Sequence, residues 1–189
     1  MATSRSGPGS TIPVERALAA VATQLRPHLV PTVPAGKSLR LRDRGGDLPE
    51  VVLGLRRERR LFSRTFPLTL DAQEIGPGPP SGGLVELHKA RWGHRTQLRW
   101  RTPVPPKGEW WLERLEGTGL IRGAQQMTSV QVMTLAWESA DHRWKLHMET
   151  LAGAVIASGP LMPILVPLEP DDVEGILTVL RSFVATCRG

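Results

Sequence analysis

The chain has 189 residues, of which 40% are hydrophobic and 22% charged, a composition that excludes a disordered polymer and allows one domain with a buried core. The net charge of +6 favours partners that carry negative charge, namely nucleic acid, anionic lipid or an acidic protein. The single Cys excludes an internal disulfide, and no apolar signal segment follows the N-terminal residues, so we expect a cytoplasmic protein.

The first expected element is a helix over residues 13–24. Its apolar residues recur at helical spacing, at Val14, Leu18, Val21 and Leu25. Pro27 ends the helix near Leu25, because proline disfavours the helical conformation of the residue before it. Residues 1–10, rich in Ser, Gly and Pro, are expected to form a disordered tail, and the prolines of residues 31–36 indicate a loop.

Residues 39–70 predict strands with short connections. Residues 39–42 alternate apolar and basic side chains, residues 44–47 suit a turn, and residues 50–55 have the β-branched content of a strand. The basic run at residues 56–60 then interrupts the apolar pattern, which resumes at residues 61–70. We interpret the run as a charged loop between two strands, and a helix through this run is the alternative.

A segment of Gly, Pro and Ser at residues 76–83 is the clearest interruption in the chain. Such a composition builds no core element, so we expect a flexible loop within one sheet. Residues 11–189 are therefore predicted to form a single domain.

Two hairpins follow this loop. The first joins residues 84–91 to residues 94–102 through a turn at Trp92 and Gly93. In its second strand Arg95, Gln97, Arg99 and Arg101 fall on one face, and His94, Thr96, Leu98 and Trp100 fall on the other. The second hairpin, residues 129–136 and 142–150, also places Trp on one face and cations on the other. A half-buried antiparallel sheet with a solvated outer face gives the same pattern without a binding function.

The remaining chain predicts a strand and a long final helix. Residues 109–116 suit a helix or a strand. Residues 150–168 lack charge, but three Pro and two Gly exclude a regular membrane-spanning helix, so we expect a buried strand at residues 151–157, a turn and an extended segment. Pro170 begins the last helix. Its apolar stripe is Val173, Ile176, Leu177, Leu180, Val184 and Cys187.

These elements predict an α+β fold: a mainly antiparallel β-sheet of about five to seven strands, with an N-terminal helix and a C-terminal helix packed on it.

No catalytic motif is recognisable. His142 and His147 are five residues apart, which suits neither one helix face nor one strand face. Arg122 stands where a dinucleotide-binding loop carries its third Gly, and Ser158 lacks the first Gly of a nucleophile elbow. We predict no cofactor and no metal site. An active site assembled from distant residues stays open as an alternative.

The positive charge is concentrated in two blocks. Residues 37–64 carry nine Lys or Arg against four acids, and residues 88–101 carry five against none. The hypothesis is a non-enzymatic protein that binds single-stranded nucleic acid, with Arg contacting phosphates and exposed Trp stacking on bases. The predicted contact residues are Arg56, Arg57, Arg59, Arg60, Arg91, Arg95, Arg99, Arg101, Trp92 and Trp110.

Three alternatives stay open. The same Arg surface suits an adaptor or chaperone for an acidic protein partner. A curved sheet and the final helix also suit a hydrophobic small ligand, and a homodimer is compatible with either function. A GC-rich genome produces the same preference for Arg over Lys without any functional cause.

Overall fold

The computed structural model describes residues 14–35, 38–59, 63–78, 83–92, 95–101, 115, 118–127, 129–158 and 163–188. Side chains are described for the same residues except 33–35, 59, 63, 88–92, 95–99 and 158. The predicted tail at residues 1–10 lies outside this description, as do the greater part of the element at residues 109–116 and half of the loop at residues 76–83.

The described chain forms one antiparallel sheet and three helices, which confirms the α+β class. The strands are β1 (Leu29–Ala35), β2 (Ser38–Asp43), β3 (Val51–Leu55), β4 (Glu58–Arg59), β5 (Ser63–Ile75), β6 (Gly83–Trp92), β7 (Arg95–Arg101), β8 (Val130–Glu138), β9 (Arg143–Ser158) and β10 (Ile164–Leu165). The helices are α1 (Val14–Leu25), α3 (Gly119–Gln126) and α4 (Pro170–Arg188). The sheet order is β1-β2-β3-β5-β9-β8-β6-β7, with β4 paired to β5 and β10 to β9, so the sheet is wider than expected.

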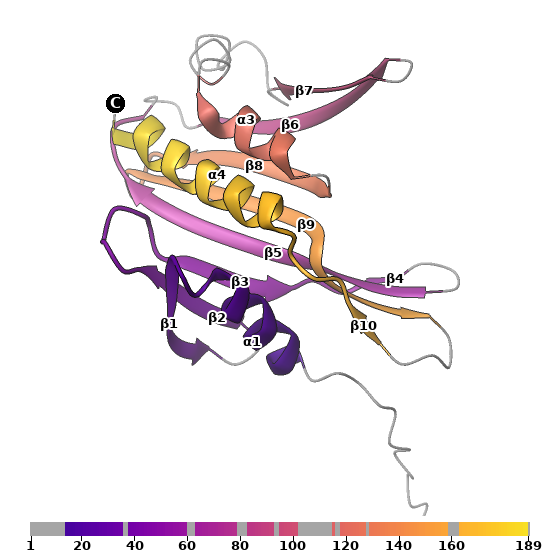
Figure 1. Ribbon diagram of the computed structural model, residues 1–189. Coiled ribbons are helices and arrows are strands. Elements are labelled where there is room, and N and C mark those ends of the chain that lie inside the picture. Colours follow the sequence, from indigo (N-terminus) through magenta and orange to yellow (C-terminus); the bar gives the residue numbers. More distant parts are fainter. Residues whose placement is uncertain are drawn as a thin grey trace, which may run out of the picture.

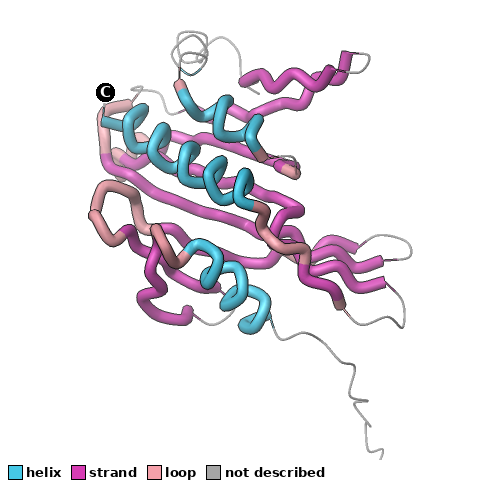
Figure 2. The backbone as a smooth tube through the Cα atoms, in the orientation of Figure 1, coloured by secondary structure: helices cyan, strands magenta, loops and turns pink. Residues whose placement is uncertain are grey.

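All three helices lie on the same face of the sheet (Figure 1). Helix α4 crosses β5 and β9, α3 lies beside α4, and α1 packs on β1, β2 and β3. Figure 2 shows the same two layers, helices in front and strands behind. No helix in the described part of the chain is both long and apolar enough to cross a lipid bilayer. The opposite face carries no described helix, and we call it the open face.

The core lies between the helices and the sheet, where the predicted patterns are confirmed. Leu18, Val21 and Leu25 of α1 are buried, as are the alternate residues Trp144 and Leu146 of β9. The rings of Trp137 and Trp144 lie with their centroids 5.1 Å apart, and Trp100 is buried as well. The described Trp side chains are therefore core residues and offer no exposed ring for stacking.

Helix α4 confirms the predicted boundary and stripe. The Asp172 carboxylate accepts a hydrogen bond from the Glu169 backbone N–H at 3.1 Å and so satisfies a donor at the helix start. Cys187 is fully buried, and this burial, together with the charge of Glu74, raises the pKa of its thiol. A thiol held in its neutral form is a packing group rather than a nucleophile.

The expectation of a loop at residues 31–36 was wrong, because β1 is a strand as far as Ala35. Among the described strands it forms an edge of the sheet and pairs with β2 alone, with a register shift between Pro31 and Pro34. Proline lacks a backbone donor, which an edge strand tolerates on its unpaired side.

Helix α3 was not predicted, because Gly119 and Gly123 lower the helix propensity of its sequence. Tertiary contact explains why it forms. Ideal Cβ atoms built on Gly123 and Gly175 would each lie 2.9 Å from the other residue's carbonyl oxygen, so α3 and α4 meet at their backbones. Thr118 caps the helix by accepting a hydrogen bond from the Leu120 N–H.

The two strands expected at residues 142–150 and 151–157 are one continuous strand, β9, with a bend. Gly153 has φ of +77°, which an L side chain rarely adopts, and its N–H donates to the Val166 carbonyl beside β10. On β5 the register shifts between Phe66 and Leu68 at the same level. This irregularity lies directly beside the candidate site.

Candidate binding surface on the open face

The open face carries a row of aligned side chains that crosses seven strands. From β2 to β7 the row is Arg40 on β2, Val52 on β3, Asp71 on β5, His147 on β9, Thr134 on β8, Glu86 on β6 and Arg101 on β7. Directly opposite residues on adjacent strands lie close enough to interact. The strand register therefore brings together charges that are far apart in the sequence.

His147 lies at the centre of the row between two carboxylates. Its Nδ1 is 2.7 Å from Asp71 Oδ1, and its Nε2 is 3.1 Å from Glu149 Oε1. A neutral imidazole has one N–H donor, whereas the imidazolium has two, so only the charged form donates to both carboxylates. The Asp71 hydrogen bond raises the pKa of His147, burial opposes this effect, and Glu149 reinforces it.

Glu149 is buried although it lies on the open face, since it is only 3% exposed. Its second oxygen, Oε2, lies 2.8 Å from a guanidinium nitrogen of Arg56. Arg56 is positioned by the backbone, because its N–H donates to the Pro67 carbonyl at the β5 register shift. The buried carboxylate thus has Arg56 on one oxygen and, when His147 is protonated, the imidazolium on the other, and these cations offset its desolvation.

Ion pairs and hydrogen bonds also flank this cluster. Arg40 and Arg42 bind the two oxygens of Glu50 at 3.0 and 2.9 Å, and the Arg42 hydrogen bond holds the pKa of Glu50 below its usual value. Lys145 lies 2.6 Å from Glu138. The centre of the open face and the part on β2 therefore hold cations that are already paired with acids.

The structure describes only part of the predicted contact set. Arg56 is engaged with Glu149, Arg57 is exposed beside β4, and Arg101 is exposed at the end of β7. The side chains of Arg59, Arg91, Trp92, Arg95 and Arg99 are outside the description, as are residues Arg60 and Trp110.

The two basic blocks lie on separate parts of the sheet. Strand β4 pairs with β5, whereas β6 and β7 follow β8, so β5, β9 and β8 lie between the blocks. At the usual strand spacing of about 4.8 Å, the four steps from β4 to β6 amount to about 19 Å across the strands, and β4 and β6 also lie at different levels along β9. One phosphate group does not reach both blocks.

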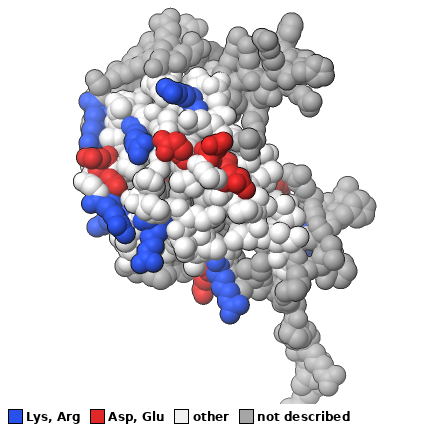
Figure 3. All heavy atoms as spheres, viewed as in Figure 1, with Lys and Arg blue, Asp and Glu red and all other residues white. Residues whose placement is uncertain are grey.

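Among its described residues, the helix-bearing face shows no concentration of positive charge like that of the two basic blocks. Figure 3 shows Lys and Arg interspersed with Asp and Glu on this face. The described side chains therefore include both basic and acidic residues on the helix-bearing face and on the open face.

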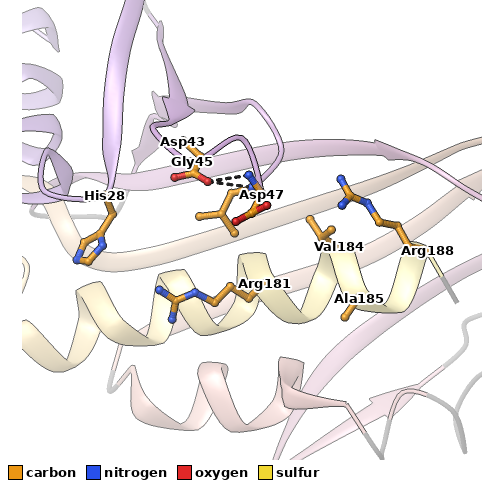
Figure 4. A pocket seen from close by; sticks show the side chains of 9 residues that line it. His28, Asp43, Gly45, Asp47, Arg181, Val184, Ala185 and Arg188 are labelled. Atoms are coloured by element: carbon orange, nitrogen blue, oxygen red, sulfur yellow. Dashed lines mark hydrogen bonds between the residues drawn. The ribbon is translucent and has the colours of Figure 1, made fainter.

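A groove of about 520 Å³ lies between α4 and the turn that joins β2 to β3 (Figure 4). Residues of α4, including Arg181 and Arg188, line one side, and His28, Asp43 and Asp47 line the other. Several of these groups hold the fold. Asp43 accepts hydrogen bonds from the backbone of Asp47 and Leu48, and Arg188 binds Glu74 at 3.2 Å.

The charges of Asp43 and Arg188 are thus committed to the protein's own structure. The described Trp and Met side chains lie in the core and do not line this groove, so the structure adds no support to the hydrophobic-ligand alternative.

Sequence reasoning missed the cluster around His147. The alternation of β9 does place His147 and Glu149 on one face, and that signal was available. Asp71 and Arg56 reach them only through the register of β5 on β9, which no local pattern specifies. Within the described ranges, no group of three or more His, Cys, Asp or Glu is arranged to hold a metal ion.

Comparison with protein-family models, with curated proteins and with solved structures gives no match to this chain.

Proposed function

We propose that this chain is a non-catalytic binding protein that holds single-stranded nucleic acid at the β6–β7 end of the open face. The observation that supports the proposal is the ladder between these strands. Arg95 pairs in register with Trp92, and Arg99 with His88, so no carboxylate stands opposite either Arg. Arg101, opposite Glu86, is exposed where the hairpin joins the rest of the face.

This ladder differs from the centre of the face, where acids accompany the cations. A polyanion gains most from cations that lack a carboxylate partner, because phosphate contact then releases bound counterions without breaking an ion pair. A sheet face on which no described helix lies also suits an extended nucleic-acid strand. Since Trp100, Trp137 and Trp144 are buried, base stacking in this proposal falls to Trp92 and Trp110.

The test is titration of labelled single- and double-stranded oligonucleotides at several salt concentrations. The test variant is Arg95→Ala/Arg99→Ala/Arg101→Ala. The matched control is Arg16→Ala/Arg26→Ala/Arg122→Ala, which removes the same charge from exposed positions on helices and the α1–β1 turn. Both variants are first shown to be folded by circular dichroism.

We expect the log–log dependence of affinity on salt to lose about 0.7 per phosphate contact, or about 2 for three contacts, in the test variant. The control variant should keep the wild-type slope, because its charges lie on α1, on α3 and in the α1–β1 turn, on the helix-bearing side of the sheet rather than on the open face. Equal slopes in wild type and test variant contradict the proposal. Absence of binding to both nucleic acids at low salt leaves an acidic protein partner as the use of this hairpin.

A further inference from the structure

The network around His147 connects three separate parts of the chain. Asp71 belongs to β5, His147 and Glu149 belong to β9, and Arg56 belongs to the connection between β3 and β4. Asp71 and His147 are 76 residues apart in the sequence. The network adds a side-chain link to the backbone pairing of β5 with β9, and it holds the β3–β4 connection over the open face.

The integrity of this link depends on the number of protons on His147. With two protons the ring donates to both carboxylates, and the four side chains sum to zero charge. With one proton the ring keeps a single donor, so one carboxylate faces a nitrogen lone pair and the cluster carries one negative charge. Asp71 is half exposed and can turn to water, whereas Glu149 is buried and cannot.

We propose that Asp71, His147, Glu149 and Arg56 form a pH-sensitive clasp, which joins β5, β9 and the β3–β4 connection when His147 is doubly protonated and loosens when His147 loses a proton to solvent. The clasp is a property of the fold and does not depend on nucleic-acid binding. Histidine changes its charge near neutral pH, and burial or a neighbouring carboxylate moves the pH at which it does so.

Several charged groups surround His147. The charged groups that face it are Asp71 from β5, Lys145 and Glu149 from β9, Arg56 from the β3–β4 connection, and Glu86 from β6 beyond the neutral Thr134 of β8. Lys145 is paired with Glu138, and Arg56 with Glu149. The net charge of the cluster therefore changes mainly when His147 gains or loses its second proton.

The direction of the effect follows from linkage. The pKa of His147 is raised by folding, so the folded chain binds this proton more tightly than the unfolded chain does. The stability that the clasp contributes is complete below the unfolded value and is lost as pH rises through the folded value. Between these two values the unfolding constant increases by up to about tenfold per pH unit.

The first experiment follows the imidazole nitrogens of the full-length protein by NMR between about pH 5 and pH 9. The midpoint of His147 should lie above its ordinary value of 6.5. In Asp71→Asn the midpoint should fall, because an amide does not favour the charged ring. A midpoint at or below 6.5, or the same midpoint in Asp71→Asn, overturns the clasp.

The second experiment measures denaturant unfolding over the same pH range. His147→Gln should lose the alkaline decrease in stability that wild type shows. His28→Gln, which removes an exposed histidine at the α1–β1 turn, should retain it. Retention of the wild-type decrease in His147→Gln also overturns the clasp. If His147→Gln does not fold, the NMR comparison of wild type with Asp71→Asn still decides the matter.

A comparison of two arginine variants tests whether Arg56 belongs to the clasp. Arg56→Ala leaves His147 as the cation on buried Glu149, so its loss of stability should grow as pH rises through the His147 midpoint. Arg57→Ala removes a neighbouring exposed Arg and should show the wild-type pH dependence. Parallel pH profiles for the two variants contradict the assignment of Arg56 to the clasp.

Discussion

Replacing Gly123 by Ala tests how closely α3 and α4 approach each other. The new Cβ would lie 2.9 Å from the Gly175 carbonyl oxygen, 2.9 Å from the Val179 backbone nitrogen and 2.8 Å from Val179 Cγ2. Ordinary contacts begin near 3.4 Å, so the helices must separate by about 0.5 Å. Two of the three obstructing atoms belong to the backbone of α4, which is itself packed on the sheet, and no side-chain rotation relieves them.

The magnitude is the difference between two opposing effects. Overpacking a close interface costs about 1–3 kcal/mol, and the higher helix propensity of Ala returns up to about 1 kcal/mol. Because the obstruction is backbone, we expect Gly123→Ala to lower the free energy of unfolding by about 1–2 kcal/mol.

The assay is urea unfolding followed by circular dichroism, with slope and midpoint compared between variants. Gly45→Ala is the control, because its Cβ would meet only carboxylate oxygens of Asp43 and Asp47 at 3.4 and 3.6 Å. It should change stability by less than about 0.5 kcal/mol. A wild-type midpoint for Gly123→Ala would refute the backbone contact between α3 and α4.

Two further substitutions test the core and the bend of β9. Leu180→Ala should lower stability by about 2–5 kcal/mol, because Leu180 is fully buried in the α4 stripe, and an unchanged denaturation midpoint would show that the stripe is not buried. Gly153→Ala should cost at least about 1–2 kcal/mol from its left-handed backbone, with an added contact at 2.8 Å to Leu68, and a melting temperature equal to wild type would argue against the positive φ.

Helix α4 and the two hairpins could be predicted because their signals are local. The 3.6-residue period places Ile176, Leu180 and Cys187 on one side of a helix wherever that helix lies. The period of two does the same for Trp144 and Leu146 in β9. To interpret such a pattern one needs to know only which face is buried, and the positions of the apolar residues indicate that face.

Strand β1 and helix α3 could not be predicted, because their formation depends on tertiary contacts that a local sequence pattern does not reveal. Pro31 and Pro34 indicate a loop until the strand is known to be an edge, with one side free of pairing. Gly123 disfavours a helix until α4 is known to approach within backbone contact, where any larger residue is excluded. At Gly123 a tertiary contact outweighed a helix propensity that is about 1 kcal/mol less favourable than that of Ala.

The charge arrangement shows the same division between sequence and tertiary structure. The amino-acid sequence by itself determined that two basic blocks exist and that β7 alternates basic with apolar residues, since composition and alternation are one-dimensional properties. Only the tertiary structure decided that β5, β9 and β8 lie between the blocks, and that Arg56 neutralises Glu149. Strand order and register bring residues together across dozens of positions of chain, and the free energy that selects them comes from the whole sheet rather than from any one segment.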